Sequence, residues 1–422
     1  MNHNRRKSIK VFEHQVLKVG DEGSFKEKHF LTLEKYAYRH NEKYFVIGNK
    51  RIKFNNYVGV IQVRDLTIEV LPKADFNEKT EENKNKWHDA LITILRKCKL
   101  IKIDSITDAY LKLKSASILD LYFDAFLSEI EGLVKQGLSK KYRAVESNLN
   151  TLKGKLLFAE HINRNLVHKE KFYVEHKIYD IDNLLNQILL KGIIILSNIA
   201  SNPNFSVRIK RLLLNFENVS DTLITSKSFE KLTLSRNTER YKRALELAKL
   251  IILKYSPDLK GGNENVLAIL FDMNRLFEEY IFRELKLQQN NYQIKVKKQI
   301  RKPFWETRGI RPDILIETKC GNFIIDTKWK LIKGNCPSDD DLKQMFTYNL
   351  HYDSTLSILL YPKTKYNDCD KKPFKDDRFN TYYCKLAFTD LFDENAKLIN
   401  DLGEKLYNQL LKEEIVDNKC VN

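Results

Sequence analysis

The sequence has few of the residues that mark small, cross-linked proteins. Its 422 residues include only six cysteines, 14 glycines and 8 prolines. No two cysteines are spaced as a CxxC pair, so the spacing of a zinc finger is absent. Free thiols in a reducing cytoplasm are therefore the expected state of these cysteines.

A long hydrophobic run is also missing. The opening residues, MNHNRRKSIKVF, contain no apolar stretch of the kind that a signal peptide needs. The most apolar run, ILLKGIIILSNIA from Ile188, contains Lys191 and is too short to span a bilayer. We expect a cytoplasmic protein with no membrane partner, in which this run is a buried helix.

Several catalytic motifs are absent from the sequence. Three glycine-containing stretches, VGDEGSFK, KGKLLF and GGNENVLA, lack the G-x-x-x-x-G-K-[ST] spacing of a nucleotide-binding P-loop. The chain is therefore not expected to be its own P-loop motor. It also has no H-E-x-x-H, no G-x-S-x-G and no grouping of histidines and cysteines typical of HNH nucleases, which leaves metalloprotease, serine hydrolase and zinc-nuclease functions unsupported.

Positive charge is the main compositional excess. The formal net charge is +17 and the pI is about 9.3, with 42% hydrophobic and 31% charged residues. The hydrophobic content predicts a packed protein, and the length allows two or three domains. The charge favours a polyanionic partner, most commonly nucleic acid, although a general lysine-rich composition is the alternative explanation.

The pattern along the chain predicts a mixed α/β protein in three parts. Residues 1–86 are predicted to form a β-rich domain that ends in a polar linker at 74–86. Residues 87–260 show the three- and four-residue spacing of helices, and the stretch 256–265 is a plausible boundary. In residues 261–422 we expect a helix over 266–288, two or three strands over 293–329, a helix over 339–350 and a strand over 355–362.

Charged residues occur at unusual places in the stretch RPDILIETKCGNFIIDTKWK, residues 311–330. Two β-prone runs joined by KCGN predict a hairpin, in which Asp326 and Lys328 share one face and Asp313 opens the first strand. Two carboxylates brought together repel each other unless a cation lies between them, and carboxylate oxygens suit Mg²⁺ or Mn²⁺. Lys328 beside that metal can orient or deprotonate a water, or offset charge on a phosphate.

Neighbouring helices supply further candidates. Glu278 or Glu279 can point from the preceding helix toward the sheet edge, while Gln344 and Tyr348 share one face of the following helix. Each residue alone has an ordinary explanation as a turn cap, strand edge, surface charge or core side chain. Their order along the chain, a helix with Glu, Pro-Asp, a hairpin, Asp-x-Lys and a helix with Gln-x-x-x-Tyr, favours a functional site.

This order resembles the PD-(D/E)xK nuclease superfamily, with the PD at Pro312 and Asp313 and the D-x-K at Asp326 to Lys328. More narrowly, the chain resembles the McrC family, the nuclease subunit of McrBC-type modification-dependent restriction systems. The stretches that carry this resemblance are GVIQVRDLTIEVLPK (59–73), DMNRLFEEYI (272–281), RPDILI…FIIDTKWK (311–330), and DLKQMFTYNLHY (341–352) followed by LLYP (359–362).

The resemblance implies a C-terminal restriction-endonuclease-like α/β domain at 261–422 that cuts DNA. Asp313, Asp326 and Glu278 would hold Mg²⁺, with Mn²⁺ as an alternative, Lys328 would be the catalytic lysine, and Gln344 and Tyr348 would be accessory residues. It also implies a McrB-like AAA+ GTPase partner that recognises and translocates modified DNA. The helical region at 87–260 would engage that motor, and the McrC-like chain would stimulate its GTP hydrolysis.

Two other functions remain open from the sequence. One is an NTPase-activating DNA scaffold whose nuclease domain is inactive, although the intact Asp313, Asp326 and Lys328 argue against it. The other is a stand-alone DNA repair nuclease whose first 250 residues bind DNA ends.

Overall fold

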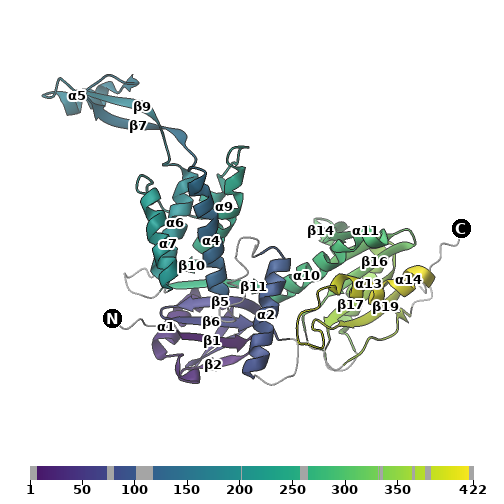
Figure 1. Cartoon of the computed structure of the whole chain (residues 1–422). Helices are drawn as coiled ribbons and strands as arrows, with labels where there is room; N and C mark the ends of the chain where they lie inside the picture. Colours follow the sequence, from purple (N-terminus) through teal and green to yellow (C-terminus); the bar gives the residue numbers. More distant parts are fainter. Residues whose placement is uncertain are drawn as a thin grey trace. The chain divides into compact units, whose positions relative to one another are not determined.

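The computed structural model describes residues 7–73, 80–100, 117–200, 202–256, 265–330, 332, 336–363, 366–375 and 382–417. They form helices and strands of a mixed α/β protein, which confirms the predicted fold class (Figure 1). The chain divides into two compact units, the first built mainly from residues 103–269 and the second from residues 7–61, 66–102 and 270–422. The predicted domain boundaries at 86 and 260 stay predictions.

The N-terminal region is rich in strands, as the sequence predicts. Strands β1 (Lys7–Phe12), β6 (Leu66–Leu71) and β5 (Tyr57–Val63) lie side by side, with β1 parallel to β6. A second, antiparallel sheet has the order β2 (Val16–Lys18), β4 (Arg51–Phe54), β3 (Phe45–Gly48), and a short 3₁₀ turn, η1 (Asp21–Gly23), follows β2. Every residue of β6 is buried, including the polar Thr67 and Glu69.

Helix α1 (Glu27–Arg39) of this part was not predicted, and helix α2 (Glu81–Lys97) begins before the stretch that we predicted to be helical. Helix α1 buries Phe30, Leu33 and Ala37, whose spacing is helical rather than alternating. Helix α2 begins inside the segment that we predicted to be a linker, of which residues 74–79 lie outside the described residues. The Thr80 side chain accepts a hydrogen bond from the Asn83 amide and caps α2. The first turn of this helix is polar and charged, and for this reason we predicted it to be part of a linker.

The first unit contains a group of packed helices, which confirms the helical prediction. Their buried faces are apolar, and the hydrophobic run from Ile188 lies within a buried helix as expected. A Cβ on Gly192 would come within 2.5 Å of the Phe126 ring, so only glycine permits this close packing. The helices are α4 (Ile118–Lys135), α6 (Leu184–Ile199), α7 (Pro203–Asn215), α8 (Ser226–Glu230), η2 (Glu239–Tyr241) and α9 (Lys242–Lys254).

The same unit contains a sheet that the sequence analysis missed. Strand β7 (Lys141–Leu149) pairs antiparallel with β9 (Phe172–Asp180) over nine residues, and β8 (Lys155–Leu156) pairs with the other edge of β9. Helix α5 (Phe158–Asn165) packs against β9. We call residues 141–180 the arm; most residues of β7 are exposed or half-buried, and the arm elements are drawn side by side in Figure 1.

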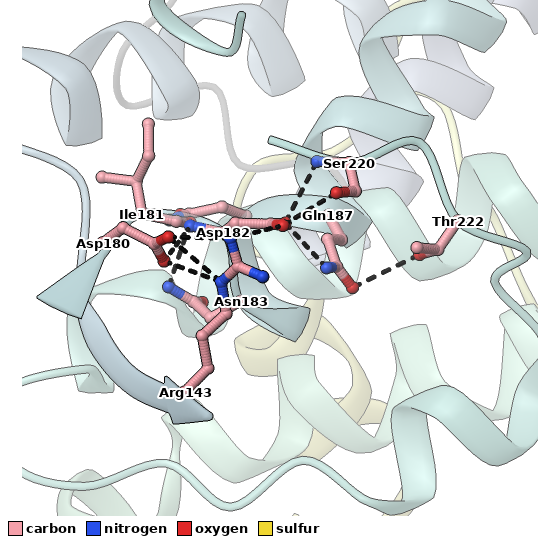
Figure 2. Close-up of polar contacts among 9 residues, drawn as sticks. Arg143, Asp180, Ile181, Asp182, Asn183, Gln187, Ser220 and Thr222 are labelled. Atoms are coloured by element: carbon pink, nitrogen blue, oxygen red, sulfur yellow. Dashed lines mark hydrogen bonds and ion pairs between the residues drawn. The ribbon is translucent and has the colours of Figure 1, made fainter. Parts of the chain in front are cut away.

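A buried carboxylate fixes the base of the arm (Figure 2). Asp182 accepts hydrogen bonds from the Ser220 amide at 3.0 Å, the Ser220 hydroxyl at 2.7 Å and the Gln187 side chain at 2.8 Å. Arg143 at the start of β7 pairs with Asp180 at the end of β9, and its Nη2 lies 3.6 Å from Asp182. Burial would raise the pKa of Asp182, but these donors and Arg143 outweigh it and lower the pKa.

The strand β11 (Val266–Asp272) corrects one prediction. We expected a helix over 266–288, whereas the helix α10 spans only Met273–Leu287 and the seven residues before it are extended. The Asp272 side chain caps α10 by accepting from the Asn274 amide. The short strand β10 (Tyr255–Ser256) pairs antiparallel with β11. Most of the predicted boundary at 256–265, namely residues 257–264, lies outside the described residues.

The C-terminal part of the second unit is built on a six-stranded sheet with the order β12-β15-β16-β17-β19-β18. The pairs β12–β15 and β15–β16 are antiparallel, whereas β16–β17 and β17–β19 are parallel. The predicted helix over 339–350 and strand over 355–362 are confirmed as α12 and β17, whereas the stretch 293–329 contains five strands instead of the predicted two or three. The strands are β12 (Lys295–Lys298), β15 (Ile314–Thr318), β16 (Gly321–Thr327), β17 (Ser354–Pro362), β18 (Lys372–Pro373) and β19 (Tyr383–Thr389).

Helices and a separate hairpin complete this part. Residues of α12, including Met345 and Tyr348, belong to one apolar core with Ile324 of β16 and Leu359 of β17. No helix within the described ranges has the length and apolar character needed to cross a membrane. The remaining elements are α11 (Gln289–Tyr292), β13 (Lys302–Trp305), β14 (Arg308–Ile310), α12 (Asp339–Tyr352), α13 (Leu402–Leu410) and α14 (Lys412–Asp417).

Candidate active site

The predicted hairpin brings Asp313 and Asp326 to one end of the sheet. Ile314 at the start of β15 is paired with Ile325 of β16, so Asp313 precedes β15 where Asp326 follows Ile325. One oxygen of Asp313, Oδ2, accepts from both the Thr327 amide at 2.8 Å and the Thr327 hydroxyl at 2.9 Å. The residue between Asp326 and Lys328 therefore holds Asp313 in place.

Asp326 is a buried carboxylate with an incomplete set of partners. Asp326 is 2% exposed, and its Oδ2 accepts no hydrogen bond from the described residues but lies 2.7 Å from the Lys328 ammonium. Burial raises the pKa of Asp326 to about 7, the nearby Asp313 adds to this, and Lys328 opposes it. A second cation at this place would be favoured, because two close carboxylates in a buried setting repel each other.

Lys328 lies among oxygen atoms. Its Nζ is 2.7 Å from Asp326 Oδ2, 3.4 Å from Asp341 Oδ1 and 3.2 Å from the Gln344 side-chain oxygen, to which it donates a hydrogen bond. Burial would lower the pKa of Lys328, but the Asp326 and Asp341 carboxylates outweigh it and raise the pKa. The lysine is therefore held as an ammonium with a fixed direction.

The two predicted accessory residues belong to the same network. Gln344 donates from Nε2 to the Tyr348 hydroxyl at 2.7 Å, and that hydroxyl donates to the Arg311 carbonyl at 3.0 Å. The chain of hydrogen bonds runs from Lys328 through Gln344 and Tyr348 to the backbone beside Pro312. The structure thus brings together five of the six predicted site residues: Asp313, Asp326, Lys328, Gln344 and Tyr348.

Glu278, rather than Glu279, is the glutamate of α10 that faces the site. Glu278 is 7% exposed and accepts from the Gln299 side chain at 2.6 Å, with Lys298 Nζ 3.5 Å away. Burial raises the pKa of Glu278, the Asp313 carboxylate adds to this, and Lys298 and Gln299 oppose it. Glu279 instead pairs with Lys298 at 2.6 Å and with Arg283.

Sequence reasoning missed Asp341, which contacts Lys328. Asp341 lies in the first turn of α12, where its amide donates to the Ser338 hydroxyl, and its Oδ2 is 2.7 Å from Lys330 Nζ. Burial would raise the pKa of Asp341, but its partners, Lys330 first, lower it. The sequence could have indicated this contact, because Asp341 lies three residues before the predicted site residue Gln344 and therefore on the same helix face.

The donor set fits a hard divalent cation with several water ligands. Mg²⁺ is commonly held by only one or two carboxylates. Asp326 supplies a buried carboxylate oxygen, Oδ2, which lies beside the Lys328 ammonium and accepts no hydrogen bond within the described ranges. Asp313 and Asp326 are close enough to raise the pKa of Asp326 by mutual repulsion. Within the described part of the chain, no three acidic, histidine or cysteine side chains are already gathered as a metal cluster. The predicted metal role of Glu278 therefore stays a prediction.

Thiols do not contribute to this arrangement. The described cysteines, Cys98, Cys320, Cys336, Cys369 and Cys384, are all free, as the sequence analysis expected. Burial raises the pKa of Cys384 to about 11, which keeps it a neutral thiol. The chemistry available at the site is therefore that of carboxylates and one ammonium, a combination suited to an anionic substrate and a divalent metal.

These features define a mixed α/β protein with a buried carboxylate and lysine site. A family model described as "McrBC 5-methylcytosine restriction system component" matches residues 52–362, well over half of the chain. The chain therefore belongs to this restriction-system family, which confirms the resemblance seen in the sequence. None of the curated proteins compared with the chain matched it.

Solved structures agree with the fold. A chain of the refined half-complex of Thermococcus gammatolerans McrB AAA+ hexamers with bound McrC aligns with a TM-score of 0.69 and 22% identity, covering 97% of this chain and all of that one. A chain of the Thermococcus gammatolerans McrBC complex aligns with a TM-score of 0.49 and 24% identity, covering 66% of this chain and 86% of that one. At these identities the first comparison supports the fold alone, and the second carries no further argument.

Proposed function

We propose that this protein is the Mg²⁺-dependent DNA endonuclease subunit of a McrBC-type restriction complex. The observation that carries the proposal is the convergence of Asp313, Asp326 and Lys328, fixed to one another through Thr327. Carboxylates that bind a metal, beside an ammonium that faces a phosphate, are the groups that phosphodiester hydrolysis needs.

The arrangement of elements supports a PD-(D/E)xK nuclease domain. The sheet carries the antiparallel β15–β16 hairpin at its centre and the parallel strands β17 and β19 beyond it. Helix α10 brings Glu278 near Asp313, and α12 brings Gln344 to Lys328. This is the order that the sequence motif requires of the domain.

The roles of the residues follow from their contacts. Asp313 and Asp326 would hold the metal, with Mn²⁺ as an alternative to Mg²⁺ and Glu278 as a helper carboxylate. A bound metal would supply a Lewis acid for the phosphate and a more acidic water. Lys328, held as an ammonium by Asp341 and Gln344, would offset the negative charge that develops on the phosphate.

The partner is proposed to be a McrB-like AAA+ GTPase whose hydrolysis this chain stimulates. The Thermococcus McrC is bound to McrB AAA+ hexamers, and the present sequence contains no P-loop pattern of its own. The helical region and its arm supply a surface for such a motor. On α5, Phe158 and Ile162 are 70% and 57% exposed, and Leu166 one turn later is 69% exposed. Apolar residues exposed together in this way are typical of a protein interface.

The proposal is tested with the complex of this chain and the motor with which it co-purifies. Asp326→Asn and Lys328→Met should reduce cleavage of modified DNA by about 100-fold or more, while GTP hydrolysis by the motor is still stimulated. Cleavage that persists in both variants contradicts the assigned site.

The same assay separates the two alternatives. Stimulated GTP hydrolysis without any cleavage by the unaltered protein, in Mg²⁺ or Mn²⁺, indicates an inactive scaffold. Metal-dependent cleavage without any co-purifying motor indicates a stand-alone nuclease. EDTA should abolish cleavage, but it also removes the Mg²⁺ that GTP hydrolysis needs, so Asp326→Asn rather than EDTA isolates the proposed metal of the nuclease domain.

A further inference from the structure

An open pocket lies between the β13–β14 hairpin and helix α12. Its volume is about 760 Å³, and three arginines line it: Arg301, Arg308 and Arg311. Phe304 of β13 lines it on the hairpin side, and Gln344 and Tyr348 line it on the α12 side.

The hairpin exposes two aromatic rings close to three arginines, a combination that is unusual for a surface in contact only with water. Phe304 and Trp305 are 54% and 58% exposed on adjacent positions, and all three arginines are exposed. The Arg308 guanidinium lies 5.7 Å from the centre of the Trp305 ring. Exposed aromatic rings combined with guanidinium groups are typical of surfaces that hold nucleic acid, because the rings contact bases and sugars while the guanidinium groups contact phosphates.

The hairpin is anchored rather than loosely attached. The Tyr352 hydroxyl of α12 lies 2.6 Å from the Ile300 carbonyl and 2.9 Å from the Ile310 carbonyl, one on each side of the hairpin. That hydroxyl also accepts from the Lys302 amide at 3.1 Å, and the Lys302 ammonium donates to the His351 carbonyl at 2.6 Å. A rigidly placed hairpin loses little conformational entropy when it binds a ligand.

The pocket adjoins the proposed active site through shared side chains. Gln344 accepts from Lys328 and donates to Tyr348, and the Tyr348 hydroxyl donates to the Arg311 carbonyl. Arg311 itself is two residues before Asp313. Gln344 thus contacts Lys328 and also lines the pocket that contains the three arginines.

We propose that the β13–β14 hairpin and this pocket bind the DNA strand next to the bond that is cut. In this arrangement Arg308 and Arg311 pair with phosphates, and the exposed Phe304 ring packs against a nucleotide. The inference rests on the proposed nuclease function and assigns that site its DNA-positioning surface. Glu306 in the hairpin turn is the one acidic residue between β13 and β14, and its charge opposes phosphate binding.

The test is binding of a fluorescein-labelled DNA duplex to the full-length protein in EDTA, measured over a series of salt concentrations. Arg308→Gln combined with Arg311→Gln should weaken binding at least tenfold at low salt. It should also reduce the slope of log K against log salt by about 0.9 for each phosphate that the variant no longer neutralises. Phe304→Ala should also weaken binding of the duplex, with little change in slope, because it removes a contact but no charge.

One variant serves as a control, and another tests the effect of charge in the opposite direction. Lys319→Ala removes one positive charge at the opposite end of the β15–β16 hairpin and should leave affinity and slope unchanged. Glu306→Gln should strengthen binding, because it removes the opposing charge. All of these side chains are exposed, so the variants should melt like the unaltered protein.

Arginine variants that bind DNA with the affinity and slope of Lys319→Ala overturn the proposal, as does an unaltered protein that binds no DNA at low salt. A synthetic acidic peptide is the competitor. If it binds the unaltered protein but not the arginine variant, and displaces no DNA, the pocket belongs to a protein partner and the proposal is overturned. Asp326→Asn should still bind DNA in EDTA, at least as tightly as the unaltered protein, because it removes a negative charge from the place proposed for the phosphate. Failure of the nuclease assignment therefore shows in cleavage alone, and failure of the pocket shows in binding.

Discussion

The indole Nε1 of Trp329 donates a 2.7 Å hydrogen bond to the carboxylate of Glu13, across 316 residues of sequence. Trp329 directly follows the proposed catalytic Lys328, while Glu13 follows the first strand of the N-terminal region. Glu13 is 2% exposed, and it also accepts from the Lys73 amide at 2.8 Å. The N-terminal strands of the second unit therefore help to fix the end of β16, where the candidate site lies.

This contact predicts a specific pH dependence of stability. Burial raises the pKa of Glu13 to about 7, with the Lys73 amide and Trp329 opposing the rise. In the unfolded chain the carboxyl ionises near pH 4.5, so between that pH and 7 the folded state binds more protons than the unfolded state. The contribution of the protonated Glu13 to the free energy of unfolding is therefore fully present below pH 4.5. It is lost as the pH rises from there through 7.

Glu13→Gln removes this titration while keeping an acceptor for Trp329. Relative to the unaltered protein, the variant's free energy of unfolding should rise by roughly 2.5 kcal/mol between pH 5 and pH 8, the part of the full pKa difference that titrates in this range. Urea unfolding of the two proteins at both pH values measures this difference. An equal response of the two proteins to pH would show that Glu13 does not titrate in this way.

The Thr327 hydroxyl is predicted to position Asp313 for metal binding. Thr327→Val removes one of two hydrogen bonds to Asp313 Oδ2 and leaves the backbone donor in place. Side chains that orient a metal ligand typically contribute 10- to 100-fold to activity or metal affinity, so cleavage and Mg²⁺ affinity should fall within this range. Thr327→Ser keeps the hydroxyl and is the matched control. Equal losses in both variants would point to packing rather than to the hydrogen bond.

Asp341 should act by holding the Lys328 ammonium. Asp341→Asn removes the charge 3.4 Å from Lys328 Nζ while conserving shape, and we expect about a tenfold lower kcat with little change in DNA affinity. Lys330→Ala is the control, because it removes the other partner of Asp341 without touching Lys328. Single-turnover cleavage and DNA binding, measured on the same preparations, separate the two effects. A variant with a full cleavage rate would exclude Asp341 from the positioning of Lys328.

Elements of the fold and the site could be predicted from the sequence where they depend on residues close together in the chain, but not where they depend on distant ones. The β15–β16 hairpin and the shared face of Gln344 and Tyr348 follow from local alternation and helical spacing, so the sequence predicted them. The segment 266–272 was predicted to be helical because a short apolar run fits both structures. The contact between Glu13 and Trp329 links distant segments, and no local pattern carries it.

The arm was missed for a different physical reason. Strand β7 is largely exposed on both faces, so its sequence, KYRAVESNL, lacks the regular alternation of a half-buried strand. Its neighbour α5 likewise exposes its apolar side chains instead of burying them. The secondary structure of such exposed segments is difficult to predict from one sequence, because no buried face imposes a regular apolar pattern on them.

The exposed apolar residues of α5 should contribute to binding of the proposed motor. Phe158→Ser combined with Ile162→Ser should weaken association with the motor at least tenfold, because each buried apolar side chain typically contributes about 1.5–3 kcal/mol. Val207→Ser changes a side chain on α7 that is 58% exposed and serves as the control. Neither change removes buried contacts, so both variants should keep their melting temperatures. Stimulated GTP hydrolysis as a function of protein concentration reports the affinity, and an unchanged half-maximal concentration for the α5 variant would rule this surface out of the motor interface.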